Sequence, residues 1–302
     1  MVGRVTGAAG APRYLVIGAS GLIGRRFLRA VGPASATGTF LTRPFPGGVR
    51  FDMTQGGIGE LLARLPGDFT HAVVMGGNST IDRCARDPEG TARVNVTGPC
   101  CLIDELLERN ITPIFTSTDG VYDGSHGLWR EDQPAQPILT YARQKLEVEQ
   151  HLAAQNCPWL AVRVAKVLDA EGDPTAVLAP WIADLRSGRL IRCATDQRFS
   201  PVGADDVIAA IRGLAEAGVS GVYNLGGGEA LSRWDLLAML VVALERVHPI
   251  APRIEASSIR DFPFAEPRPL DTSMDIGKLV AAISYRPESL EGLCARAVAS
   301  AY

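Results

Sequence analysis

The chain has 302 residues, a net charge of −3 and a composition typical of globular proteins, with 46% hydrophobic and 21% charged residues. This length holds one large domain or two smaller ones. Because no long run of one charge sign is present, nucleic acid and anionic membranes are not expected partners. No stretch reaches the roughly 18 apolar residues that a membrane-spanning helix needs. We therefore expect a globular protein without nucleic-acid or membrane contacts.

The six cysteines and four histidines form no recognisable site. No C-x-x-C spacing occurs, and Cys100 and Cys101 stand in an apolar stretch that is typical of a core. Reduced thiols in a cytoplasmic protein are therefore expected, and the first residues contain no apolar run typical of a signal peptide. The histidines lack a ligand spacing such as H-E-x-x-H, so no metal is expected.

Strand-like and helix-like segments alternate through the first half of the chain. Helical patterns, among them 88–110 and 140–155, separate short apolar runs that predict strands at 13–19, 37–41, 71–77, 112–118 and 159–168. This alternation is typical of α/β proteins in which helices cover both faces of a parallel sheet. We therefore predict a doubly wound parallel sheet over residues 12–166.

The alternation breaks after residue 167. A Pro-rich segment leads to a helix predicted at 204–218 and a strand at 221–228, so residues 201–228 are expected to return to the sheet. Ser232, with Asp235 three residues later, is typical of a capping box at the start of another helix. Residues 167–200 and 229–302 are therefore predicted to form a smaller, partly interleaved C-terminal lobe.

A glycine-rich turn follows the first predicted strand. "GASGLIG" places Gly18, Gly21 and Gly24 between that strand and a helix start. Gly18 permits a sharp turn, Gly21 lets the backbone approach a pyrophosphate, and Gly24 permits close helix–strand packing. Free N–H groups at the helix N-terminus favour an anion there. The alternative is a glycine turn without a ligand. The residues expected to bind a dinucleotide here are Gly18, Ser20, Gly21, Leu22, Ile23 and Gly24.

The end of the second predicted strand bears on which dinucleotide is bound. Many such sites place an acidic residue there, on the ribose 2′-hydroxyl. Here "FLTRP" offers Arg43 and no acid. Since an arginine suits a 2′-phosphate, we predict that NADPH is preferred and that NADH is possible. The alternative is that Arg43 is a solvated surface residue.

A tyrosine and a lysine share one face of the helix predicted at 140–155. "YARQK" places Tyr141 and Lys145 four residues apart. Hydride delivery to a ketone builds negative charge on its oxygen, and a positioned acid must supply a proton. Tyrosine carries that proton, and a nearby ammonium is expected to lower its pKa from about 10. The pair therefore predicts a reductase site, against the alternative of a surface helix pair.

These motifs together resemble the extended branch of the short-chain dehydrogenase/reductase superfamily, whose fold is a Rossmann-type sheet. The resemblance implies that Asp52 and Met53, in "RFDMT", contact the adenine. It implies that "MGGN" lies along the cofactor, and that Asn95 in "VNVTG" holds a structural position. Three hydroxyl residues end the strand in "IFTSTDGVYDG", and the resemblance selects Thr118 over Thr116 and Ser117 as the hydroxyl that orients substrate. The cofactor contacts implied from "MGGN" are Met75, Gly76 and Gly77.

Two further stretches resemble dTDP-4-dehydrorhamnose reductases: "STDGVYDG" and "RPLDTSMDIGKL". This resemblance implies reduction, by hydride from NADPH, of the C4 ketone of a nucleoside-diphosphate 4-keto-6-deoxy sugar. It makes Arg268 a candidate for a phosphate contact, with a structural ion pair as the alternative. Trp129 either stacks on a sugar or base, or packs. The implied substrate contacts are Thr118, Asp119, Val121, Trp129 and Arg268.

The sequence also leaves other functions open. The fifth predicted strand ends in "RVAKVLD", where sugar-nucleotide enzymes often carry an aromatic residue and a glycine. The same motifs occur in the regulatory beta subunit of methionine adenosyltransferase, which binds dinucleotide but serves as a partner protein. An epimerase or dehydratase is a third reading, although Asp119 has no neighbouring glutamate to form an acid/base pair. A homodimer is possible under each reading.

Overall fold

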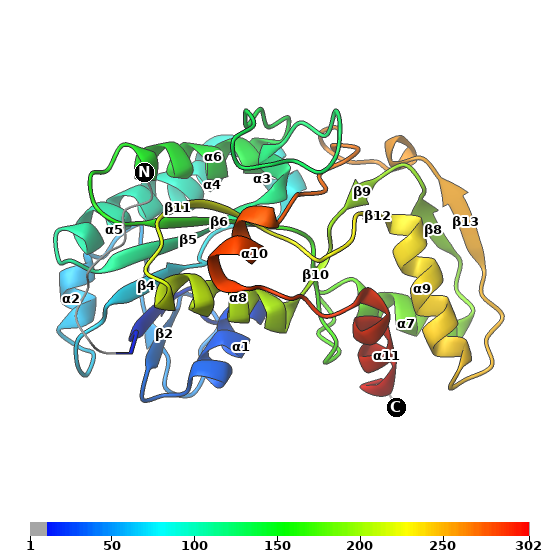
Figure 1. Ribbon diagram of the computed structural model, residues 1–302, viewed down its shortest axis with the longest axis horizontal. Coiled ribbons are helices and arrows are strands. Elements are labelled where there is room, and N and C mark those ends of the chain that lie inside the picture. The colour runs from blue at the N-terminus through cyan, green and yellow to red at the C-terminus, as the bar shows by residue number, and fades with distance from the viewer. Residues whose placement is uncertain (1–10, 302) are drawn as a thin grey trace.

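The computed structural model describes residues 11–301. Its centre is a seven-stranded parallel sheet of the Rossmann type (Figure 1). The predicted doubly wound α/β fold is therefore confirmed. The short edge strand at Val49–Arg50 was not predicted, because two residues carry no periodicity. In spatial order the strands are β11 (Gly221–Leu225), β6 (Leu160–Val164), β5 (Thr112–Thr118), β4 (His71–Val74), β1 (Tyr14–Ile17), β2 (Ala36–Phe40) and β3 (Val49–Arg50).

Helices cover both faces of the sheet, because its strands are apolar on both sides. Figure 1 shows the two layers. On one face Phe27, Ile211 and Leu279 join the sheet core, and on the other face Leu61, Ile103 and Leu152 do so. The first layer consists of α1 (Leu22–Val31), α8 (Ala204–Glu216) and α10 (Gly277–Ile283); the second contains α2 (Ile58–Leu62), α5 (Gly98–Leu107) and α6 (Thr140–Ala153).

The helix predicted at 88–110 is a composite of three segments. It runs through α4 (Pro88–Ala92), a π-helical turn (Arg93–Thr97) and α5, and α3 (Ile81–Arg86) precedes it. Asp87 begins α4, with its side chain accepting a hydrogen bond from the Gly90 N–H and proline in the first turn. The π-helical turn contains Asn95, which is buried. Such single-turn insertions are frequent at functional sites.

The strand predicted at 159–168 is broken in two. β6 ends at Val164, and β7 (Val167–Leu168) leaves the sheet to pair with β10 (Val202–Gly203). The break has a physical cause in the main chain: the Ala165 N–H donates to Leu225 O in the sheet, whereas Lys166 O accepts from the Val202 N–H. The chain therefore changes partner at Ala165 and Lys166.

A separate apolar core lies beyond the sheet. Leu178, Leu236, Leu240 and Leu293 pack within it. Helix α9 (Arg233–Glu245) begins at the predicted capping box. The Ser232 side chain accepts a hydrogen bond from the Asp235 N–H, and the Asp235 side chain accepts one from the Ser232 N–H. The elements around this core are α7 (Leu178–Ser187), β8 (Ile191–Ala194), β9 (Arg198–Phe199), β12 (Leu231–Ser232), α9 (Arg233–Glu245), β13 (Ile254–Ser257) and α11 (Leu290–Ala299).

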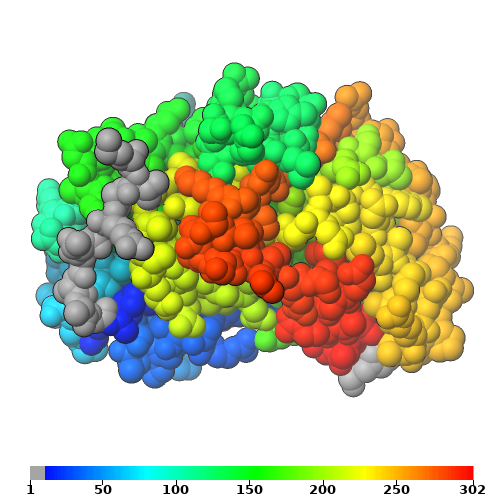
Figure 2. Space-filling view, in the orientation of Figure 1, coloured from blue at the N-terminus to red at the C-terminus, as the bar shows by residue number. Residues whose placement is uncertain are grey.

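One part of the predicted 229–302 lobe packs elsewhere. Met274, Leu279 and Tyr285 belong to the core under the sheet, and α10 lies against α8 and β11. Figure 2 shows this orange segment across the middle of one face, between the sheet helices and the C-terminal lobe. The chain thus returns to the sheet a second time before α11. Within the described residues no helix is long and apolar enough to cross a membrane.

Candidate active site

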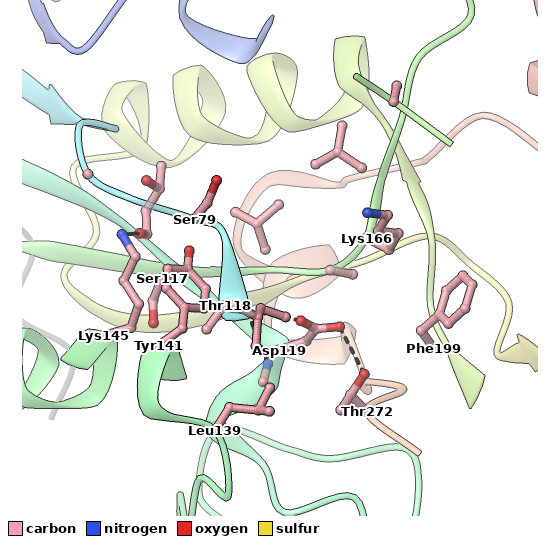
Figure 3. A pocket seen from close by; sticks show the side chains of 18 of the residues that line it. Ser79, Ser117, Thr118, Asp119, Leu139, Tyr141, Lys145, Lys166, Phe199 and Thr272 are labelled. Carbon is pink, nitrogen blue, oxygen red and sulfur yellow. Dashed lines mark hydrogen bonds between the residues drawn. The ribbon is translucent and has the colours of Figure 1, made fainter. Parts of the chain in front are cut away.

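A cleft of about 810 Å³ opens where the sheet meets the C-terminal lobe. The carboxyl ends of β1, β4, β5 and β6 supply one wall, and residues 192–199, Arg233 and 259–272 supply the other. In doubly wound sheets this edge is where ligands bind. Figure 3 shows Lys145, Tyr141, Thr118 and Asp119 on one side and Lys166 and Phe199 toward the other.

The glycine loop has the geometry that its spacing predicts. Gly18 has φ +80°, and a Cβ on it would lie 2.6 Å from Gly76 Cα. A Cβ on Gly24 would lie 2.5 Å from Ala19 Cα, so only glycine fits at either position. Gly21 precedes α1, whose N-terminus has no side-chain cap and is therefore open to an anion. The loop residues that line the cleft are Gly18, Gly21, Leu22, Ile23 and Gly24.

Ser20 is placed differently from its neighbours in the loop. It is not among the residues that line the cleft, and its carbonyl oxygen accepts a 2.6 Å hydrogen bond from Arg25. The other arm of Arg25 pairs at 3.0 Å with Asp173. Ser20 therefore shapes the loop through its main chain.

The residues predicted to contact the rest of the cofactor divide into two groups. Met75, Gly76, Gly77 and Asn95 line the cleft. The side-chain amide of Asn95 is used to hold the protein backbone. Its Oδ1 accepts a hydrogen bond from the Asn78 N–H at 2.7 Å, and its Nδ2 donates to Asn78 O at 3.0 Å. It thereby fixes the loop that follows β4.

Arg43, Asp52 and Met53 lie outside this cleft. Arg43 is exposed after β2, and Asp52 accepts hydrogen bonds from the Thr54 N–H at 2.9 Å and hydroxyl at 2.7 Å. Met53 lines a second cavity of about 630 Å³, and its side chain touches the space beside Gly76. The predicted adenine residues are thus at the margin of the cleft.

Tyr141, Lys145 and Thr118 come together in the cleft from α6 and β5. Lys145 Nζ donates to Thr116 O at 2.9 Å and lies 5.8 Å from the centroid of the Tyr141 ring. Thr118 Oγ1 accepts from the Gly120 N–H and donates to Asp119 Oδ1, both at 3.1 Å. These three side chains form one polar cluster facing the cleft.

The other two hydroxyls of the strand are already engaged. Thr116 Oγ1 donates to Val74 O at 3.1 Å. Ser117 Oγ donates to Glu149, which also pairs with the buried Arg163 at 2.6 Å. Thr118 bonds to its chain neighbours Asp119 and Gly120, so of the three hydroxyls it can turn to a ligand without breaking a contact with another strand or helix.

Burial sets the protonation of the cluster. It lowers the pKa of Lys145 to about 8 and raises the pKa of Tyr141 above its usual value, with the charges of Cys84 and Asp119 acting in the same direction on the tyrosine. The expected lowering of the Tyr141 pKa by the ammonium is thus wrong for this structure, because desolvation of the phenolate dominates and raises the pKa. Tyr141 keeps its proton at neutral pH, as a proton donor must.

Two of the predicted substrate contacts are instead packed inside the protein. Val121 is fully buried and does not line the cleft. Trp129 is 5% exposed, stacks on Tyr122 and His126, and donates from Nε1 to Asp271 O at 3.1 Å. Of the two roles considered for Trp129, packing inside the protein is therefore the one observed.

Asp119 and Arg268 line the cleft but have protein partners. Asp119 accepts hydrogen bonds from the hydroxyls of Thr118 and, at 2.9 Å, Thr272, and burial raises its pKa. Arg268 pairs with Asp82 and donates to Glu266 O at 3.2 Å. The structural ion pair considered for Arg268 is therefore present.

Several residues that line the cleft were not predicted. Arg233 is the first residue of α9 and lies 5.0 Å over the Trp181 ring. Lys166 is exposed to the cleft at the strand break. The unusual end of the fifth predicted strand, "RVAKVLD", could have drawn attention to Lys166. No sequence pattern marks Arg233, because it reaches the cleft only through the packing of the lobe. The unpredicted lining residues include Lys166, Arg192, Gln197, Phe199, Arg233 and Phe262.

The potential metal-binding side chains are scattered in the described part of the chain. No group of three or more His, Cys, Asp or Glu side chains is arranged there to hold a metal ion. The polar side chains of the cleft are hydroxyls, one phenol, amides, amines, guanidinium groups and one half-buried carboxyl.

The chain is similar in sequence and in fold to known reductases. The chain is 31% identical to a probable low-salt glycan biosynthesis reductase of Haloferax volcanii over 216 residues, 70% of this chain and 71% of that protein. It is 27% identical to a dTDP-4-dehydrorhamnose reductase of Streptomyces griseus, covering 85% and 84% of the two chains. A dTDP-4-dehydrorhamnose reductase of Bacillus anthracis, solved in complex with NADP, superposes with a TM-score of 0.82 at 17% identity over 95% of this chain and 98% of that one.

The match to a protein family is nearly complete in length. The model of the RmlD substrate binding domain matches residues 13–301, which include both walls of the cleft. The chain therefore belongs to the RmlD substrate-binding domain family.

Proposed function

We propose that the protein is an NADPH-dependent reductase of a ketone on a nucleoside-diphosphate sugar. The reaction that the resemblance favours is at the C4 ketone of a 4-keto-6-deoxy sugar. The single observation that carries the proposal is that Thr118, Tyr141 and Lys145 share one cleft with the glycine loop at the N-terminus of α1. The names of the reductases among the relatives agree with it.

The residues present fit a dinucleotide. The open N-terminus of α1 supplies N–H groups for a pyrophosphate, and the small residues Gly18, Gly21 and Gly76 let it approach. Arg43 is exposed after β2 and has no ion-pair partner in residues 11–301, which supports a role for it on a 2′-phosphate. When bound, NADPH supplies the hydride.

The residues of the chain perform the acid chemistry. Thr118 moves its hydroxyl hydrogen bond from Asp119 to the carbonyl oxygen of the substrate. Tyr141 transfers its proton to that oxygen as negative charge builds on it. The ammonium of Lys145 would stabilise the phenolate that remains and would bond to the ribose hydroxyls of a bound dinucleotide. This order uses Tyr141 in its protonated form, which burial favours.

Arg233 is the better candidate for the diphosphate than Arg268. Arg268 is bound to Asp82, whereas Arg233 has no acidic partner in the described part of the chain. A guanidinium group binds phosphate oxygens in a bidentate manner. Phe262, on the same wall, offers a ring to the nucleoside.

Two other functions have less support. A dinucleotide-binding regulatory subunit would not need the catalytic cluster, which is intact. A dehydratase would need a second acid/base group beside Asp119, and the next residue is Gly120.

The test is a panel of dTDP-, UDP- and GDP-linked 4-keto sugars, each offered with NADPH and with NADH, with the products identified by NMR. We expect turnover of at least one sugar nucleotide and a higher kcat/KM with NADPH. Tight NADPH binding without turnover of any member would favour the regulatory subunit, and a strong NADH preference would remove the role of Arg43.

A further inference from the structure

The positive side chains that line the cleft differ in whether the protein already neutralises them. Lys145 bonds to a carbonyl of β5, and Arg192 and Arg268 each pair with a carboxylate. Lys166 and Arg233 have neither an ion pair nor a side-chain hydrogen bond within residues 11–301. Two cations in one cleft are thus left for a ligand.

Lys166 stands at the reacting end of the cleft. Val164 at the end of β6 pairs in register with Thr118 at the end of β5, and Lys166 follows two residues later. Its backbone is held by the 3.0 Å hydrogen bond from the Val202 N–H to its carbonyl oxygen. Figure 3 shows its amine directed into the cleft, away from Phe199. Lys166 and Thr118 therefore face one cleft from the ends of neighbouring strands.

The surroundings of Lys166 are deficient in negative charge. Burial and the charge of Arg233 both lower the pKa of Lys166. Asp119 is the acid that acts in the opposite direction, but it forms no ion pair with Lys166 and is held by the hydroxyls of Thr118 and Thr272. An anionic group that entered beside Lys166 would supply the missing charge.

A neutral sugar would fit this environment poorly. It would remove water from the ammonium without replacing the lost hydrogen bonds, which is unfavourable for a charged group. A carboxylate would replace them with a charge-assisted hydrogen bond. The diphosphate has a separate candidate partner in Arg233, which lines the lobe wall at the start of α9.

We propose that Lys166 selects substrates whose sugar carries a carboxylate close to the carbon that is reduced. This inference rests on the proposed function: it narrows the ketone-bearing nucleoside-diphosphate sugar to one with a carboxylate, in place of an uncharged 6-deoxy sugar. Lys166 binds the carboxylate, Arg233 binds the diphosphate, and the ketone lies between Thr118 and Tyr141. Lys166 is thus a specificity-determining residue of the cleft.

The experiment is a calorimetric titration of the full-length protein saturated with NADPH. The ligands are UDP-glucuronic acid, UDP-glucose and UDP, and the corresponding dTDP compounds. We expect the acidic sugar to bind at least about tenfold more tightly than the neutral sugar on the same nucleotide, which is the size of a charge-assisted hydrogen bond. Lys166→Gln should abolish that preference and leave the binding of UDP or dTDP unchanged.

Lys278→Gln is the matched control, because Lys278 lies outside the cleft and donates to Val222 O. It should keep the preference. Arg233→Gln should weaken all the nucleotides alike. The inference is overturned if the wild type binds acidic and neutral sugars equally, or if Lys166→Gln weakens UDP and UDP-glucuronic acid by the same factor. If the NADPH complex binds none of these nucleotides, the proposed function fails as well.

Discussion

The two walls of the cleft are built in different ways. On the sheet wall, polar groups are held by the protein itself: Lys145 by a carbonyl of β5, and Ser117 by Glu149. Two cations of the cleft are not held in this way: Lys166, just beyond the end of β6, and Arg233, on the lobe wall, have no acidic partner in the described chain. The difference teaches that the reacting groups are prearranged on the sheet, whereas Arg233 on the lobe and Lys166 where the sheet meets it are left to receive charge from a ligand. The following variants test that division.

Tyr141→Phe should have the largest effect and should act on the chemistry alone. Loss of the proton donor is expected to lower kcat by about 10²- to 10⁴-fold. The dissociation constant for NADPH, measured by fluorescence, should remain nearly unchanged. Tyr14→Phe is a matched control, because the Tyr14 hydroxyl is buried without a hydrogen-bond partner; it should leave activity intact. Full activity of Tyr141→Phe would refute the mechanism.

Arg163→Met tests how firmly the sheet wall is held. It leaves Glu149 buried without its 2.6 Å partner, so the free energy of unfolding should fall by about 3–5 kcal/mol. Chemical denaturation followed by circular dichroism measures this. Arg212→Gln removes an exposed pair with Glu216 at 3.5 Å and serves as the control, with an expected change of less than about 0.5 kcal/mol. Equal losses in the two variants would show that the buried pair has no special role.

The pH dependence of kcat/KM should report Lys145. Its pKa is lowered from 10.5 to about 8, so the ammonium is present below that pH and is lost above it. Tyr141 remains protonated throughout, because burial raises its pKa. We therefore expect a plateau below about pH 8 and a fall of about tenfold per pH unit above it. A profile that is flat from pH 7 to 10 would contradict a catalytic ammonium.

Ser232→Ala should have the smallest effect and should be confined to the lobe wall. Ser232 caps α9 by accepting from the Asp235 N–H at 3.0 Å, and Arg233 follows it directly. Loss of the cap should lower the free energy of unfolding by about 1 kcal/mol. It should raise KM for the sugar nucleotide and leave NADPH affinity unchanged, as measured by steady-state kinetics and fluorescence. If Ser232→Ala weakened NADPH binding more than it raised KM for the sugar nucleotide, the two walls would not have separate roles.

The sequence by itself determined the elements whose signals are local. Apolar runs and helical periodicity predicted the sheet strands from β1 to β6, apart from the short β3, and the spacing of Gly18 and Gly24 predicted a turn that only glycine can form. Tyr141 and Lys145 were found together because four residues along a helix place two side chains on one face. Such patterns need no knowledge of distant contacts.

Only the tertiary structure decided what each side chain meets. Trp129 is buried in a stack with Tyr122 and His126, and Arg268 is paired with Asp82, so neither is available as predicted. Arg233 entered the cleft without any sequence signal. The physical reason is that these positions depend on packing between segments far apart in the chain. Which cations remain free is therefore settled by long-range pairing, and no local pattern records it.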